Sequence, residues 1–259
     1  MVRARKRFGQ HFLTDQGVLQ RLVNQMALRS DDRLLEIGPG QGALTEPLAA
    51  QVNALQAIEI DRDLVPFLRA RFSNLEVINE DVLRVDFAAV IAGQPTRIVG
   101  NLPYNISSPL LLKLATFNRE HPGLFRDGHF MLQREMANRM AAQPGSKAWG
   151  RLSVMLQISF DVEHLFDVAP ESFDPPPKVW SSIVRLLPLA EPLVRDAEEL
   201  AELDRVLRTA FAVRRKRLGN ALKSLGLDWQ SLGIDDGLRA DDISSEQYLA
   251  IAKWLLDQR

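Results

Sequence analysis

The feature that most restricts the fold of this chain is a glycine-rich loop that joins a short apolar run to a helical pattern. Residues 33–37 predict a buried strand, residues 38–42 are Gly-Pro-Gly-Gln-Gly, and residues 43–50 predict a helix. A strand, a glycine loop and a helix in this order open a nucleotide-type α/β unit, because glycines let a ligand approach the backbone closely.

The same loop matches most of a nucleotide-binding pattern. Gly38, Gly40 and Ala43 fit G-x-G-x-x-A, and Glu59 lies about 20 residues after the glycines. A carboxylate in that place can accept hydrogen bonds from both ribose hydroxyls of an adenosine. The pattern alone does not separate NAD from S-adenosylmethionine, and a purely structural turn is a further alternative.

Strand and helix patterns alternate along most of the chain. The expected strands are 33–37, 54–60, 75–79, 97–100 and 127–133. The expected helices are 15–26 with Thr14 or Asp15 as its cap, 43–50, 62–71, one capped by Ser107 or Ser108, 134–142, and 152–160, where a strand is the alternative. This order predicts a doubly wound, mostly parallel sheet, which residues 162–168 and 181–187 close as an antiparallel pair.

The alternation stops at residues 188–192, and the remainder is leucine-rich in helical spacing. A length of 259 residues suits two domains, so we expect an α/β domain over 1–188 and a small all-α domain over 193–259. Arg214 falls within the apolar stripe of the second domain. Either the helix breaks near residues 212–214, or the arginines there face a charged ligand.

Composition excludes several classes of protein. The chain is 46% hydrophobic and 25% charged, has no apolar run near the roughly 18 residues of a membrane span, and begins without the apolar region of a secretory signal. It contains no cysteine, which excludes disulfides and thiolate chemistry, and its four histidines lack metal-ligand spacing. We therefore expect a cytoplasmic protein without a membrane segment or a metal.

Net charge is −1, but the basic residues are clustered. One cluster consists of Arg3, Arg5, Lys6 and Arg7, and another contains Arg214, Arg215 and Lys216. A solvated surface explains such clusters as well as a nucleic-acid site does, until other motifs are considered.

The turn Gly100-Asn101-Leu102-Pro103-Tyr104-Asn105 follows the strand 97–100 and carries groups that suit an exocyclic amino group. Asn101 offers a side-chain carbonyl, Leu102 offers a main-chain carbonyl directed by the fixed φ of Pro103, and Tyr104 offers a stacking face. Asp81 follows the third strand, where its carboxylate can accept from an adenine amino group while Val82 packs on the ring. Ligands of open α/β sheets bind at this edge.

Five motifs together resemble the KsgA/RsmA family of ribosomal small-subunit RNA adenine N6,N6-dimethyltransferases. They are residues 5–13 (RKRFGQHFL), 36–42 (EIGPGQG), 100–105 (GNLPYN), 173–179 (FDPPPKV) and 211–216 (FAVRRK). Their order and spacing match the family almost from end to end.

The resemblance implies a class I, Rossmann-like methyltransferase that uses S-adenosylmethionine to dimethylate two adjacent adenosines near the 3′ end of 16S rRNA in the immature small subunit. It implies that His11 and Leu13 touch the cofactor, and that Gly38 lies beside its methionine part. Glu59 then holds the ribose, Asp81 the adenine amino group and Asn101 the methyl-transfer centre. Residues 1–188 become the cofactor-binding domain with a basic arm, and residues 193–259 the rRNA-binding domain.

The chemistry of the turn is consistent with this activity. An adenine N6 lone pair is delocalised into the ring, and hydrogen bonds from its NH2 to Asn101 and to the Leu102 carbonyl favour a localised lone pair. Fixed neutral acceptors stabilise the positive charge that grows on nitrogen, and no general base is required. Tyr104 and Phe173 are expected to stack on the two faces of a flipped adenine.

Three other functions remain alternatives. An Erm-type enzyme would methylate large-subunit rRNA, but Leu102 and the sequence Arg214-Arg215-Lys216 favour the small subunit. An assembly factor would bind immature subunits and methylate them only secondarily. An NAD-dependent oxidoreductase rests on the glycine loop alone. A monomer is the default oligomeric state.

Overall fold

The computed structural model describes residues 11–194 and 196–259. The described residues divide into two compact units, one within residues 1–137 and 163–188 and the other within residues 138–162 and 189–259. Each unit is described by itself below. Arg3, Arg5, Lys6 and Arg7 lie outside the described residues.

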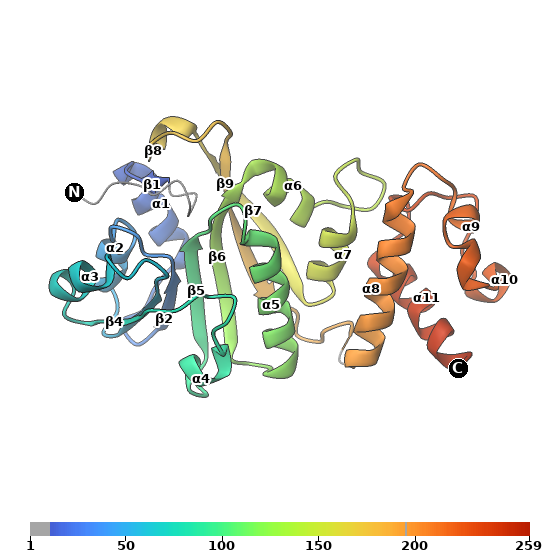
Figure 1. The fold of residues 1–259 in the computed structure, drawn as a ribbon, viewed down its shortest axis with the longest axis horizontal. Coiled ribbons are helices and arrows are strands. Elements are labelled where there is room, and N and C mark those ends of the chain that lie inside the picture. Colours follow the sequence, from blue (N-terminus) through green and yellow to red (C-terminus); the bar gives the residue numbers. More distant parts are fainter. Residues whose placement is uncertain (1–10, 195) are drawn as a thin grey trace. The chain divides into compact units, whose positions relative to one another are not determined.

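The first unit is built on a seven-stranded sheet with the strand order β4-β3-β2-β5-β6-β9-β7 (Figure 1). Strands β2 to β6 are parallel to one another, and β9 runs antiparallel to β6. The strands are β2 (Arg33–Ile37), β3 (Leu55–Ile58), β4 (Leu75–Ile78), β5 (Thr96–Asn101), β6 (Phe125–Gln133), β7 (Phe160–Val168) and β9 (Ser181–Pro188). The predicted mostly parallel sheet with an antiparallel strand is confirmed.

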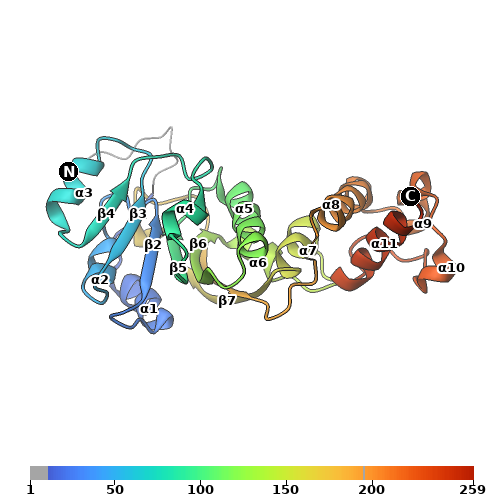
Figure 2. The ribbon, with the colours of Figure 1, turned by 90° about the horizontal axis from the view of Figure 1, so that it is seen from below.

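Helices cover both faces of this sheet, as doubly wound folds require. They are α1 (Gln16–Met26), α2 (Thr45–Ala49), α3 (Val65–Arg71), α4 (Phe87–Ile91), α5 (Ser107–Glu120) and the start of α6 (Arg134–Met140). Leucines of α1, α2 and α3 form one core cluster with alternate residues of the strands. In Figure 2, α1 and α5 lie on opposite sides of the strands. Phe87 of α4 packs against Phe117 of α5, with 5.7 Å between the ring centres.

The caps of two helices test the expectations directly. Asp15 caps α1, because its carboxylate accepts the N–H groups of Gly17 and Val18. The prediction that Ser107 or Ser108 caps α5 is wrong: Ile106 is the capping residue and provides no side-chain bond. The Ser107 hydroxyl instead donates to the Pro103 carbonyl, which fastens the helix to the turn before it.

Two short strands were not expected from the sequence. β1 (Phe12–Leu13) and β8 (Phe173–Asp174) form a separate antiparallel pair, in which Leu13 lies opposite Phe173. Two-residue strands carry no periodicity, so no pattern indicates them. The pair brings segments from opposite ends of the first domain's sequence to one wall of the first unit.

The second unit is helical, as predicted. Its helices are α7 (Arg151–Gln157), α8 (Ala197–Ala212), α9 (Leu218–Ala221), α10 (Trp229–Leu232) and α11 (Ser245–Asp257). Of the two alternatives for Arg214, the structure shows the helix break: α8 ends at Ala212, two residues before this arginine. Residues 138–162, which the sequence placed with the first domain, pack within this unit: the Trp149 indole, for example, donates to the Ile243 carbonyl.

Within the described part of the chain, no helix has the length and apolar character needed to cross a membrane.

Candidate active site

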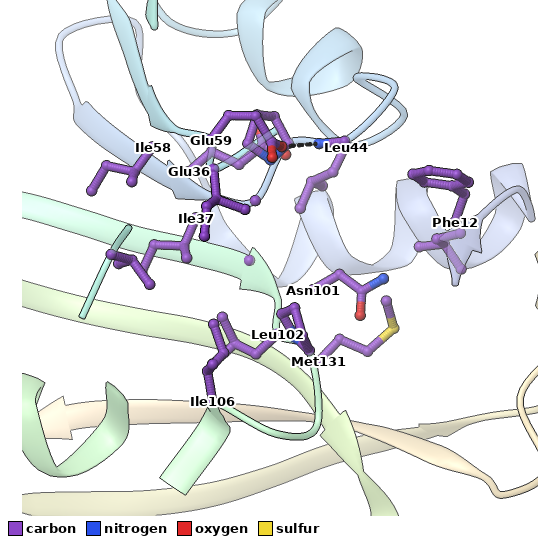
Figure 3. A pocket seen from close by; sticks show the side chains of 18 of the residues that line it. Phe12, Glu36, Ile37, Leu44, Ile58, Glu59, Asn101, Leu102, Ile106 and Met131 are labelled. Carbon is purple, nitrogen blue, oxygen red and sulfur yellow. Dashed lines mark hydrogen bonds between the residues drawn. The ribbon is translucent and has the colours of Figure 1, made fainter. Parts of the chain in front are cut away.

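A cavity of about 300 Å³ opens at the carboxyl ends of β2, β3 and β5 (Figure 3). The glycine loop, Glu59, Asp81 and the Asn101 turn all line it. Parallel strands bring their carboxyl ends to one edge of the sheet, so groups about 20 residues apart in the chain meet there. The cavity has the size of a small-molecule site.

The glycine loop leaves the backbone accessible from the cavity. Gly38 and Gly40 adopt positive φ values of 67° and 58°, a conformation that side chains with a Cβ rarely take. A Cβ at Gly38 would meet no atom within 4 Å, whereas a Cβ at Gly40 would lie 3.0 Å from the ring of Phe12. Phe12 therefore covers the loop on one side, a contact that the sequence did not predict.

Glu59 lies just beyond β3 with its carboxylate buried in the cavity wall. One oxygen accepts the Gly40 N–H at 3.1 Å, and the other accepts the Asp61 N–H at 2.8 Å. Burial raises the pKa of Glu59. Each carboxylate oxygen has a second lone pair, so the residue retains capacity for ligand hydroxyls.

Glu36 on β2 is a second buried acid of the cavity, to which the sequence assigned no role. Its carboxylate accepts the Thr45 hydroxyl at 2.7 Å. Burial raises the pKa of Glu36 to about 8, and the neighbouring Glu59 adds to the effect. Glu36 and Glu59 appear next to each other in Figure 3. We expect Glu36 to carry a proton at neutral pH.

The loop after β4 holds Asp81 and Val82, both of which line the cavity. Asp81 accepts the Leu83 N–H at 2.9 Å. Lys113 of α5 fixes this loop, because its ammonium donates to the carbonyls of Val82 (3.3 Å), Leu83 (2.8 Å) and Val85 (2.5 Å). No sequence pattern pointed to Lys113, since a lysine on a helix is usually solvated.

The Asn101 side chain extends into the cavity (Figure 3). Its amide nitrogen donates to the His11 carbonyl at 3.0 Å, which fixes the plane of the amide. The Leu102 N–H donates to the Met131 carbonyl at 3.1 Å, which fixes the peptide between Asn101 and Leu102. His11 therefore acts here through its main chain, and its ring nitrogen Nδ1 lies 2.7 Å from the Pro175 carbonyl.

The two aromatic residues that were predicted to stack on the faces of a flipped adenine differ in their surroundings. Tyr104 is half-buried, and its ring stacks on the His11 ring at a centroid distance of 6.1 Å. Phe173 lines the cavity but is only 4% exposed, because it also belongs to the core cluster. The structure thus brings both residues to the cavity wall, and their stacking on a base stays a prediction.

Three of the predicted RNA-binding residues belong to the second unit. Arg214, Arg215 and Lys216 follow α8 in the second unit and are exposed. Arg214 also has partners within that unit, since it donates to the Lys147 carbonyl at 3.0 Å and to Asp241 at 3.1 Å.

Comparison with known proteins identifies the family. The model of the family described as ribosomal RNA adenine dimethylase matches residues 1–257. The chain belongs to the ribosomal RNA adenine dimethylase family. Relatives named ribosomal RNA small subunit methyltransferase A include those of Chromohalobacter salexigens, 53% identical over 96% of this chain and 90% of the relative, and Hahella chejuensis, 48% identical over 98% and 93%.

Solved structures agree with this membership. A dimethyladenosine transferase from Plasmodium falciparum superimposes with a TM-score of 0.77 at 26% identity, over 96% of this chain and 98% of that one. The 23S rRNA methyltransferase ErmE superimposes with a TM-score of 0.68 at 29% identity, over 95% of this chain and 100% of that one. The predicted Rossmann-like methyltransferase fold is confirmed.

The dimethylase uses S-adenosylmethionine, and its cavity fits this cofactor. The open backbone at Gly38 leaves space for a ligand, and Glu59 and Asp81 offer acceptors for hydroxyl and amino groups. The predictions of an rRNA adenine methyltransferase and of its cofactor are therefore confirmed, and an NAD-dependent oxidoreductase is excluded.

Proposed function

We propose that this dimethylase methylates N6 of two adjacent adenosines near the 3′ end of 16S rRNA in immature small ribosomal subunits. Relatives 48–53% identical to the chain are named small subunit methyltransferases, whereas the 23S enzyme ErmE is 29% identical. The observation that carries the chemistry is the Asn101 amide, which is held by the His11 carbonyl at the cavity wall.

Asn101 and Leu102 are the proposed acceptors for the adenine NH2. The Asn101 nitrogen is engaged by His11, so its oxygen remains for the substrate. The Met131 carbonyl accepts the Leu102 N–H, which anchors the chain one peptide before the Leu102 carbonyl. Acceptors that are already positioned lose little free energy in reorganising as positive charge develops on N6. The bound cofactor supplies an electrophilic methyl group. The proton leaves N6 for water, and no metal ion is needed for these steps.

The cofactor contacts are proposed residue by residue. Glu59 binds the ribose hydroxyls, Asp81 accepts from the adenine amino group, and Val82 packs on the adenine ring. Gly38 and Gly40 let the cofactor approach the loop backbone. His11 and Leu13 close the cavity from the side of β1.

Substrate binding is assigned to two further groups of residues. Tyr104 and Phe173 are proposed to stack on the flipped adenine, Pro103 to orient the turn, and the basic residues to bind rRNA phosphates. The basic residues are Arg3, Arg5, Lys6, Arg7, Arg214, Arg215 and Lys216. We propose that the enzyme acts as a monomer, in the cytoplasm where its ribosomal substrate is assembled.

The decisive experiment incubates the purified protein with labelled S-adenosylmethionine and with either immature small subunits or large subunits. We expect dimethyladenosine in the digest of the small-subunit RNA only. Label in the large-subunit RNA would instead support an Erm-type enzyme, and absence of label from both would reject the proposal.

Asn101→Ala tests the acceptor role. We expect a loss of roughly a hundredfold in turnover with unchanged cofactor binding, because a group that stabilises developing charge acts in the transition state. Asn53→Ala, at an exposed asparagine away from the cavity, is the control. If subunit maturation stays normal in cells that carry only Asn101→Ala, binding is the essential activity and methylation is secondary.

A further inference from the structure

An exposed tryptophan in the first unit has no part in the chemistry described above. Trp180 is 44% exposed and its neighbour Val179 is 43% exposed, although both are large apolar side chains. Exposed indoles are uncommon on protein surfaces and are enriched where a surface binds a partner.

Trp180 lies at the same edge of the sheet as the active site. Asn101 pairs with Met131 of the parallel strand β6, and two residues further along β6, Gln133 pairs with Ser181 of β9. The Arg134 N–H donates to the Trp180 carbonyl at 2.9 Å, which fixes the residue just before β9. Trp180 is separated from Asn101 by two strand spacings across the sheet and by about three residues along the strands. Their Cα atoms are therefore roughly 14 Å apart.

The segment that carries Trp180 is fixed at both ends. Phe173 at its start pairs with Leu13 and lines the cavity, and the Pro175 carbonyl lies 2.7 Å from the His11 ring nitrogen. Pro177 in the middle is buried. One short, stiff segment therefore presents an aromatic ring inside the cavity and a second ring outside it.

One cation lies beside the exposed ring, and a second is close to it in the sequence. The Arg134 guanidinium lies 5.5 Å from the centre of the Trp180 ring, and Lys178 is exposed two residues earlier. Arg134 is also 3.7 Å from Asp167, so part of its charge is already offset. An aromatic face beside cations is the combination that binds single-stranded nucleic acid, since bases stack and phosphates are attracted.

We propose that Trp180 stacks on an unpaired base of the rRNA a few nucleotides from the target adenine, with Arg134 and Lys178 contacting its phosphates. The inference rests on the proposed function for the identity of the RNA. It adds a second aromatic subsite that helps to hold the strand while the target adenine is flipped into the cavity.

Two substitutions test the subsite in methylation assays on immature small subunits. Trp180→Ala is expected to raise KM for the subunit about tenfold and to leave cofactor affinity unchanged, since stacking on one base is removed. Trp180→Phe should restore most of the affinity because it keeps an aromatic face. Phe67→Ala is the matched control: Phe67 is 42% exposed and has Arg71 5.9 Å from its ring, but it lies on α3 and does not line the cavity.

A photo-reactive p-benzoylphenylalanine at position 180 then identifies what the surface contacts. A cross-link to small-subunit rRNA near the methylated adenosines supports the inference, and a cross-link to a ribosomal protein overturns it. An unchanged KM for Trp180→Ala overturns the inference. If the wild-type protein is active in the same assay, the proposed function is not affected by that result. If the wild-type protein methylates no small-subunit RNA, the proposed function fails, and absence of any RNA cross-link then rejects the subsite separately.

Discussion

At the scale of single residues, the active site depends on polar groups whose orientation is set by distant backbone. Asn101 is the clearest case, because its amide is held by the carbonyl of a residue 90 positions earlier. Glu59 is held by one distant and one local main-chain N–H group, those of Gly40 and Asp61. Preorganisation of this kind reduces the cost of aligning reacting atoms, which is a main source of rate enhancement.

The buried acid Glu36 makes a residue-scale prediction about pH. A glutamate in an unfolded chain has a pKa near its usual value of 4.5, whereas burial raises that of Glu36 to about 8 in the fold. Between these values the unfolded chain has released the proton that the fold retains, so rising pH lowers stability by about 1.4 kcal/mol per pH unit for this group. We expect Glu36→Gln, which cannot titrate, to gain stability relative to the wild type as pH rises from 5 to 8.

Urea unfolding at several pH values measures this effect. Glu76→Gln, at an exposed position on β4, is the control for the substitution itself. A stability difference for Glu36→Gln that stays constant with pH would show that Glu36 is ionised in the fold.

At the scale of elements, helix α5 fixes the loop after β4, which is proposed to bind the cofactor. Lys113 joins α5 to the three carbonyls of residues 82, 83 and 85, directly after Asp81. We expect Lys113→Met to cost about 1–3 kcal/mol of stability, because these carbonyls lose a charged donor. We also expect cofactor affinity to fall severalfold, because Asp81 and Val82 lose their fixed position.

Calorimetric titration with S-adenosylhomocysteine and thermal unfolding measure the two effects separately. Lys113→Arg should recover part of both, since it keeps a charged donor. Lys223→Met removes an exposed lysine of the second unit and should change neither quantity. Full cofactor affinity in a folded Lys113→Met protein would show that Lys113 does not contribute to cofactor binding.

At the scale of the whole molecule, RNA binding is proposed to use charges in the second unit as well as the active site in the first. Arg215 is exposed, whereas Arg214 is bonded to Asp241 and to the Lys147 carbonyl. A cation that binds one phosphate contributes about 0.7–0.9 to the slope of log K against log salt. We therefore expect Arg215→Glu to flatten the salt dependence of subunit binding by an amount of this order, and Arg214→Glu to flatten it less.

Binding titrations between low and moderate salt provide the slopes. Arg29→Glu, at an exposed arginine before the amino end of β2, should leave the slope unchanged. If Arg215→Glu and the wild type give the same slope of log K against log salt, Arg215 does not contact an rRNA phosphate.

Local patterns predicted most of the fold and the motifs that line the cavity. The strand–loop–helix order, the helix cap at Asp15 and the glycine loop depend on neighbours in the chain, so periodicity and turn chemistry predict them. The same holds for the Asn101 turn at the end of β5. Two expectations about helices failed: Ile106, rather than a serine, is the residue at the cap of α5, and α4 was not expected from the sequence.

By itself the sequence determined the α/β class, the helical carboxyl-terminal region, and which residue types meet at the carboxyl edge of the sheet. Only the tertiary structure decided that residues 12–13 pair with 173–174, that His11 holds Asn101, that Lys113 fixes the loop after β4 and that Glu36 is buried beside Glu59. The physical reason is range: periodicity records the environment of residues a few positions apart. Contacts between segments distant in the chain depend on how complete layers pack, which no local pattern records.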